Sequence, residues 1–111
     1  KYFESDPSYV SMVPDGADIH KGLICSGDKF ISSISEVEKI KSDFPEALAV
    51  DMESASIAQI CFYKNVSLLV MRVISDSPGA SNNNSAQYDD FWESAPRCVF
   101  NIVKDLLLRI K

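Results

Sequence analysis

Three apolar runs of this sequence each end in polar side chains of the kinds that perform acid–base chemistry or bind hydroxyl groups. The first run ends in Ser26, Gly27 and Asp28, with Phe30 and Ile31 just beyond; the second ends in Asp51, Met52 and Glu53; the third ends in Ser75 and Asp76. Carboxylates and hydroxyls are the usual side chains for moving protons. An aromatic residue, Phe30, lies close to them in the sequence.

These polar ends converge if the three runs are parallel strands joined by helices. The carboxyl ends of such strands lie along one edge of the sheet, where ligands of open α/β sheets bind. Each residue also has an ordinary structural alternative. Glu53 and Asp76 could favour helix N-termini, and Asp28 and Ser75 are common turn residues. Their convergence favours a pocket without naming a reaction.

The elements that would position these residues follow from the apolar spacing. We expect strands at 23–25, 46–52 and 66–74, helices within 35–45, where Pro45 ends the first, 53–65 and the C-terminal stretch, and a polar loop over 76–87. This order, in which a strand is followed by a helix three times, predicts an α/β fold with a mostly parallel sheet flanked by helices. Residues 1–20 are a polar leading segment with Pro7 and Pro14, and we expect either a loop or the tail of a structure whose earlier part is absent.

Two helices carry apolar faces that we expect to be buried. One face holds Ile57, Ile60 and Cys61. The C-terminal helix carries a stripe at helical spacing, which predicts core packing: Val99, Val103, Leu106, Leu107 and Ile110.

Composition limits the classes of function. The chain has 111 residues, enough for one small domain, and a formal net charge of -5, which argues against nucleic acid as a partner. It has no apolar run of transmembrane length and no signal-peptide core, so we expect a cytoplasmic protein with no membrane partner.

The cysteines and the histidine do not form a recognisable metal or thiol site. Cys25, Cys61 and Cys98 are widely spaced in apolar contexts and fit reduced core residues. His20 lies in a polar stretch and reads as a solvated loop residue. We therefore expect neither a metal nor a cofactor.

Three motifs resemble, in order and spacing, the C-terminal half of the methylthioadenosine/S-adenosylhomocysteine nucleosidases, in the purine nucleoside phosphorylase superfamily. They are "GLICSGDKFI", "FPEALAVDMESASIAQIC" and "VSLLVMRVISD". The resemblance runs from about Gly22 to the end of the chain. It implies the C-terminal part of a nucleoside phosphorylase-like three-layer domain over 1–111, and a purine nucleoside as the small-molecule ligand.

The resemblance also implies roles for eight residues. Phe30 resembles the ring that stacks on adenine, and Ile31 the residue whose backbone meets the purine edge. Met52 and Glu53 resemble the ribose-binding pair, with the carboxylate on the sugar hydroxyls. Asp76 resembles the acid at purine N7, held by Ser75. Arg72 resembles an arginine beside the pocket, and Tyr88 the aromatic residue over the 5′-substituent.

The residue types suit the cleavage of a purine N-glycosidic bond. Such cleavage passes through an oxocarbenium-like transition state, as in other glycoside hydrolyses, and protonation of N7 makes the purine a better leaving group. A carboxylic acid can keep its proton near neutral pH where burial disfavours the charged form. We expect the end of the predicted apolar strand to be such a place, and our hypothesis is that this is why an aspartate stands at position 76.

The family's N-terminal half has no counterpart in the sequence, because "KYFESDPSYVSMVPDGADIH" does not resemble it. That half supplies the carboxylate that activates water, so we expect the 111 residues alone to be inactive. The full-length protein would be a homodimer by resemblance. Two other functions stay open: a phosphorylase of the same superfamily, and a non-catalytic purine-binding fragment.

Overall fold

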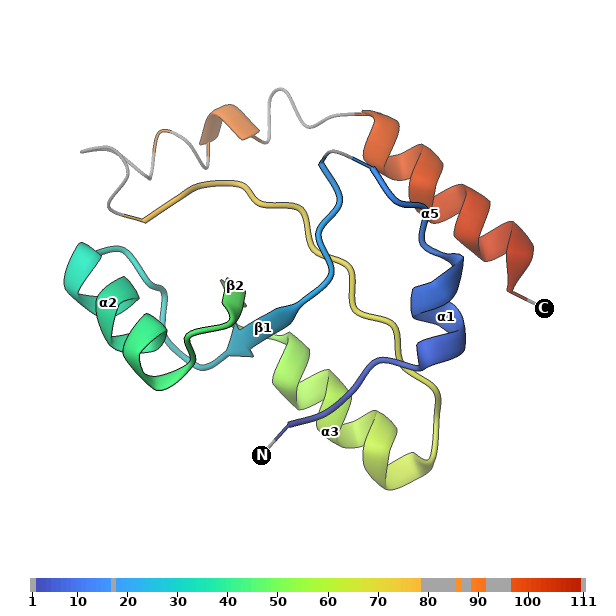
Figure 1. The fold of residues 1–111 in the computed structure, drawn as a ribbon, viewed down its shortest axis with the longest axis horizontal. Coiled ribbons are helices and arrows are strands. Elements are labelled where there is room, and N and C mark those ends of the chain that lie inside the picture. Colours follow the sequence, from blue (N-terminus) through green and yellow to red (C-terminus); the bar gives the residue numbers. More distant parts are fainter. Residues whose placement is uncertain (1, 17, 79–85, 87–88, 92–96, 111) are drawn as a thin grey trace. The chain divides into compact units, whose positions relative to one another are not determined.

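The fold comes from a computed structural model that describes residues 2–16, 18–78, 86, 89–91 and 97–110. Its elements run α1 (Pro7–Met12), β1 (Leu23–Ser26), α2 (Ile34–Asp43), β2 (Ala47–Asp51), α3 (Ser54–Lys64) and α5 (Arg97–Arg109), as labelled in Figure 1. The chain divides into two compact units. The first comprises 1–21, 56–73 and 96–111, and the second comprises 22–55 and 74–95.

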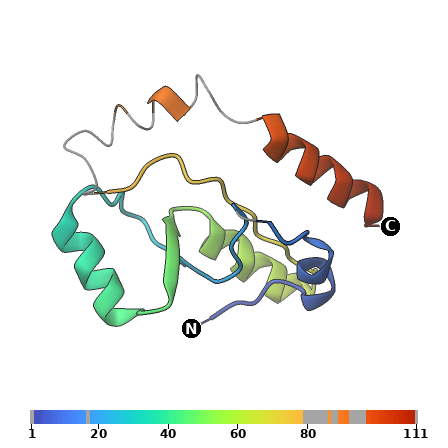
Figure 2. The ribbon, with the colours of Figure 1, turned by 45° about the horizontal axis from the view of Figure 1, so that its top comes forward.

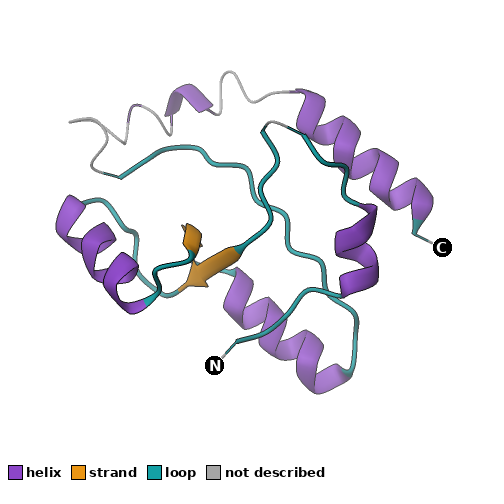
Figure 3. Cartoon of the chain, in the orientation of Figure 1, coloured by secondary structure: helices purple, strands orange, loops and turns teal. Residues whose placement is uncertain are grey.

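The second unit contains a parallel two-stranded sheet, which confirms the predicted α/β class. β1 pairs with β2 in the register Ile24↔Ala49, Cys25↔Val50 and Ser26↔Asp51, with an irregularity after Leu23. Figure 3 shows the two strands and the helices by colour. Because the strands are parallel, Ser26 and Asp51 lie side by side at their carboxyl ends, and Gly27 N–H donates to the Asp51 carbonyl at 3.0 Å.

Between these strands the chain makes the predicted helix, α2. Ser33 is the N-cap, and Ser33 and Glu36 form a capping box in which each side chain accepts from the other's backbone N–H. At the other end, Phe44 N–H donates to the Ile40 carbonyl at 2.7 Å, and Pro45 follows. A short turn then leads into β2 (Figure 2). The sequence predicted the end of this helix before Pro45, whereas the capping box at Ser33 is a finding of the structure.

The predicted helix after β2 is also present, but its buried face was wrongly predicted. α3 ends at Lys64, and Asn65 takes a left-handed conformation with φ 53°, which suits asparagine just past a helix end. Its buried residue is Ala58, whereas Ile57 and Ile60 are exposed. Spacing showed which side chains share a face, but what covers that face depends on the rest of the fold.

The third predicted strand does not form. Residues 66–77 are all described, and none of them is in a strand. A strand needs a ladder of backbone bonds to a neighbour. Here Asp6 N–H donates to the Leu68 carbonyl at 2.6 Å, but Val70 N–H donates to the Ser5 hydroxyl at 3.2 Å. The second bond uses a side chain, so the two segments lie together without a ladder.

The leading segment is not a loop throughout, because it contains α1. Asp6 is its N-cap, and the Asp6 carboxylate accepts from the backbone N–H of Ser8 at 2.9 Å and from the Ser8 hydroxyl at 2.7 Å. Pro7 occupies the first helical turn, where its missing N–H costs no hydrogen bond. "DPS" is thus a helix-start signal that the polar composition obscured.

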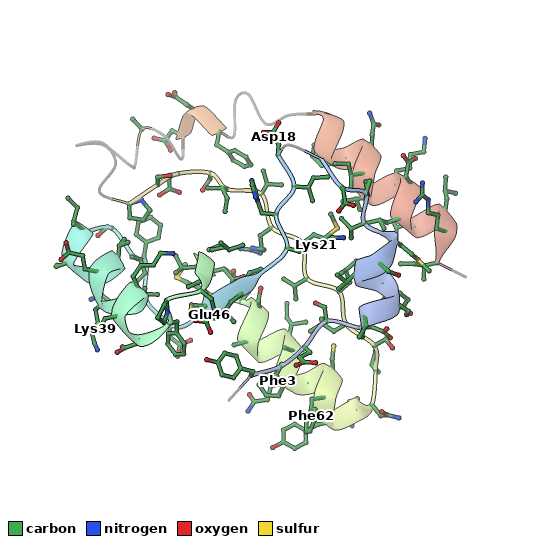
Figure 4. All side chains as sticks on the ribbon, viewed as in Figure 1. Phe3, Asp18, Lys21, Lys39, Glu46 and Phe62 are labelled. Carbon is green, nitrogen blue, oxygen red and sulfur yellow. The ribbon has the colours of Figure 1, made fainter. Side chains whose placement is uncertain are left out.

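The first unit has a small core. Val13, Ala58 and Leu106 are buried there. Close by in the chain's first unit, the rings of Phe3 and Phe62 meet edge to face with centroids 5.7 Å apart (Figure 4). Of the predicted C-terminal stripe, Leu106 is buried and Ile110 half-buried, whereas Val103 and Leu107 are exposed. The side chain of Val99 lies outside those described.

Within the described part of the chain, no helix is long and apolar enough to cross a membrane. The predicted polar loop over 76–87 lies for the most part outside the described residues.

Candidate active site

The segment that follows β1 carries the two predicted purine-binding residues. Phe30 is 51% exposed and Ile31 is half-buried. The Glu36 carboxylate fixes this segment, because its Oε2 accepts from the backbone N–H of Ser32 at 3.0 Å and of Ser33 at 3.2 Å. Its Oε1 makes an ion pair with the Lys29 ammonium.

These contacts set the charge of Glu36. The Lys29 ammonium, followed by the N–H groups of Ser32 and Ser33, lowers the pKa of Glu36 from its ordinary value of 4.5 to about 2. A cation and N–H donors stabilise the ionised carboxylate more than the neutral acid. Glu36 is therefore charged over the whole physiological range, and its hold on the segment is maintained.

The connection between β2 and α3 carries the predicted ribose pair. The Asp51 carboxylate accepts from the Ser54 N–H at 3.1 Å and from the Ser54 hydroxyl. The hydroxyl of Ser26, at the end of β1, accepts from the Ala55 N–H at 3.0 Å. Side chains from the ends of both strands thus satisfy N–H groups of the first turn of α3.

Met52 and Glu53 are held between these two anchors. Both are exposed, and the Met52 N–H donates to the Glu53 carboxylate at 3.3 Å. Exposed side chains on a short connection with fixed ends can meet a ligand at low entropic cost. The anchor at Asp51 and Ser54 has the spacing of a helix-capping pair, a sequence signal that would have identified it.

The predicted general acid, Asp76, lies in the same compact unit as the segment after β1 and the connection between β2 and α3. The Ser75 hydroxyl donates to the Asp76 carboxylate at 2.6 Å, and both residues are half-buried. A serine donating to a carboxylate fixes which way that carboxylate points.

Six of the eight predicted residues therefore belong to one compact unit: Phe30, Ile31, Met52, Glu53, Ser75 and Asp76. Arg72 is exposed in the other unit, and Tyr88 lies outside the described residues. Their roles stay predictions. Among the described residues, no group of three or more His, Cys, Asp and Glu side chains could hold a metal ion.

A separate hollow of about 390 Å³ lies in the first unit, between residues 3–7 and residues 58–68. The described residues that line it, Phe62 and Cys61 among them, include none of the eight predicted site residues. The candidate site and this hollow are distinct features.

Comparison with known proteins defines the family. Residues 1–108 match the model of the Phosphorylase superfamily. The chain belongs to this superfamily. Its relatives include the 5′-methylthioadenosine/S-adenosylhomocysteine nucleosidase of Haemophilus influenzae (strain PittEE). The two sequences are 38% identical over 95 residues, and this stretch covers 86% of this chain and 41% of the relative. The nucleosidase of the same name from Staphylococcus aureus (strain JH9) is 45% identical over 74 residues, 67% of this chain and 32% of the relative.

Solved structures agree with the sequence relatives. A structure described as such a nucleosidase from Borrelia burgdorferi B31, bound to adenine, matches 97% of this chain and 48% of its own, with a TM-score of 0.86 and 32% identity. The nucleosidase of S. pneumoniae with the transition-state inhibitor MT-ImmA matches 96% of this chain and 47% of its own, with a TM-score of 0.84 and 36% identity. The chain thus spans about half the length of the solved relatives it matches.

Proposed function

We propose that the protein to which this chain belongs hydrolyses the N-glycosidic bond of 5′-methylthioadenosine and S-adenosylhomocysteine and releases adenine. The observation that carries this proposal is the match of 97% of the chain to an adenine-bound nucleosidase structure at a TM-score of 0.86. The Haemophilus influenzae relative, 38% identical, supports the same activity.

In this proposal Asp76 is the general acid. It donates a proton to purine N7 as the glycosidic bond breaks, so that adenine leaves as a neutral base while the sugar becomes oxocarbenium-like. Ser75 orients the Asp76 carboxyl group, a role that the 2.6 Å hydrogen bond supports. The fixed direction matters because proton transfer needs the acid within hydrogen-bond reach of N7.

The other predicted residues bind the substrate. Glu53, with Met52 beside it, grips the two ribose hydroxyls, and a carboxylate is the natural acceptor for such a pair. Phe30 stacks on adenine and the backbone of Ile31 meets the purine edge. Arg72 and Tyr88 complete the ribose end and the 5′ end of the site by resemblance alone.

We further propose that the 111 residues form the C-terminal part of a nucleoside phosphorylase-like domain and are inactive alone. The support is coverage, because the chain spans 41% of the Haemophilus influenzae relative and 48% of the adenine-bound neighbour. The residue that activates water would then come from the remainder of the longer protein, which we expect to be a homodimer.

Adenine release from methylthioadenosine in phosphate-free buffer, with the intact mass recorded, tests the activity. In an active sample, Asp76→Asn should lower turnover by about 10²–10⁴, the typical contribution of a general acid, while adenine still binds. Asp43→Asn, on the exposed surface of α2, is the control and should leave turnover unchanged. Full turnover in Asp76→Asn would contradict the role of Asp76.

The same assay separates the alternatives. In the longer protein, turnover that requires phosphate would identify a phosphorylase, and adenine binding without turnover would identify a non-catalytic purine-binding protein. Release of adenine by a sample of the 111-residue mass would show that this chain alone holds a complete site.

A further inference from the structure

The Glu36 carboxylate contacts the chain on both sides of the predicted purine-binding pair. Before the pair, the Lys29 ammonium makes an ion pair with Oε1. After it, the N–H groups of Ser32 and Ser33 donate to Oε2 at 3.0 and 3.2 Å. Phe30 and Ile31 therefore lie in a short turn, residues 29–33, with a side-chain contact to Glu36 before them and backbone contacts to Glu36 after them.

This arrangement does more than cap a helix. A capping box needs the reciprocal bonds between Ser33 and Glu36, and these are present. The additional bonds to the Ser32 N–H and to Lys29 extend the hold to residues before the N-cap. Those residues flank the pair that is proposed to contact adenine.

The two kinds of contact differ in strength. The Lys29 side chain is 73% exposed, and an ion pair with such a group contributes little because water screens it. Glu36 is only 22% exposed, and its bonds to backbone N–H groups are charge-assisted. The backbone bonds should therefore account for most of the hold on the turn.

We propose that Glu36 is a positioning residue for the purine, which fixes the turn of residues 29–33 so that Phe30 and Ile31 are ordered before adenine arrives. The inference rests on the proposed function, since it takes those two residues as the purine contacts. Without Glu36 the ring of Phe30 must be ordered upon binding. That ordering costs about two- to tenfold in affinity, the penalty for immobilising one side chain.

Three substitutions and one control test the proposal. Glu36→Ala removes every contact, Glu36→Gln keeps an amide oxygen as acceptor but loses the charge, and Lys29→Met removes only the ion pair. Asp43→Ala is the matched control, because it breaks the other ion pair of the same helix, Lys39–Asp43 at 3.0 Å. Lys39 is labelled in Figure 4, on the outer surface of α2.

The measurement is calorimetric titration of the isolated protein, of recorded intact mass, with adenine. We expect Glu36→Ala to raise the Kd for adenine about two- to tenfold at unchanged stoichiometry, with a smaller rise for Glu36→Gln and the smallest for Lys29→Met. Asp43→Ala should leave the Kd unchanged. A purely structural role would instead lower the number of competent sites and leave the Kd of the folded fraction as it was.

Other results would overturn the proposal in distinguishable ways. An unchanged Kd in Glu36→Ala, or an equal rise in Asp43→Ala, would remove the positioning role while leaving the proposed function intact. Failure of the unmodified protein to bind adenine would contradict the purine site of the proposed function, and the positioning role with it.

Discussion

Two adjacent leucines of α5 offer a direct test of how burial determines stability in the first unit. Leu106 is 4% exposed, whereas Leu107 is 67% exposed. In two separate variants, Leu106→Ala and Leu107→Ala, one of these neighbouring leucines of the same helix is replaced by alanine. Helix propensity therefore changes by the same small amount in each variant, and the difference between the two reports burial alone.

The expected magnitudes follow from these exposures. Truncating a buried leucine costs about 2–5 kcal/mol, from lost transfer free energy and the cavity left behind. Only about a third of the Leu107 side chain is buried. At about 2 kcal/mol for complete burial of a leucine, the cost of Leu107→Ala is about 0.7 kcal/mol or less. The free energies of unfolding of the two variants should differ by about 2 kcal/mol.

Urea unfolding followed by far-ultraviolet circular dichroism measures this difference, and thermal unfolding gives an independent value. One kcal/mol corresponds to about 4–8 °C in Tm for a domain near this size, so the two midpoints should differ by about 10 °C. Equal costs for the two substitutions would refute the reasoning. They would mean that Leu107 is covered in the protein under study.

Three further predictions follow from single contacts. The pKa of Glu36 falls from 4.5 to about 2 on folding, so its ionised form stabilises the fold above about pH 4.5, and this contribution is lost as the pH falls toward about 2. The free energies of unfolding of the wild type and of Glu36→Gln, measured against pH, should therefore converge over that interval. Parallel curves would contradict the prediction. In Gly22→Ala the new Cβ would lie 2.9 Å from Leu48 Cγ, but Leu48 is 56% exposed and its side chain can turn away. We therefore expect a loss of about 1 kcal/mol or less on urea unfolding, which Leu48→Ala relieves, and a larger loss would show that the Leu48 side chain cannot move. Partial burial, with Glu46 nearby, raises the pKa of the half-buried Cys25 thiol. Alkylation of Cys25, followed by peptide mass spectrometry, should therefore be slower in the folded protein than in urea, and equal rates would contradict the raised pKa.

The parts of the fold that the sequence predicted correctly depend on neighbours within a few residues. The end of one helix before Pro45, the end of the next near Asn65 and the alternation of apolar strands with helices all follow from local hydrogen bonding and spacing. These local signals were sufficient to predict the α/β class, and the resemblance to the family depends on three short stretches of sequence.

The bonds that support the candidate site were not predicted. The sequence predicted Phe30 and Glu53 as site residues by resemblance, and their roles stay predictions. It did not reveal that Glu36 holds the turn around Phe30, or that Ser26 joins the end of β1 to the first turn of α3. These bonds link groups that come together only once the strands and helices have formed, so they leave little trace in the spacing of residue types.

By itself, the sequence determined the order and type of most elements, because helices and turns are stabilised by hydrogen bonds between residues close in the chain. The tertiary structure alone decided that α3 buries Ala58 and not Ile57, and that Leu106 but not Leu107 of the predicted stripe is buried. It also decided that residues 66–77 form no strand. Both outcomes depend on partners distant in sequence, since burial needs a covering surface and a strand needs a neighbour to pair with.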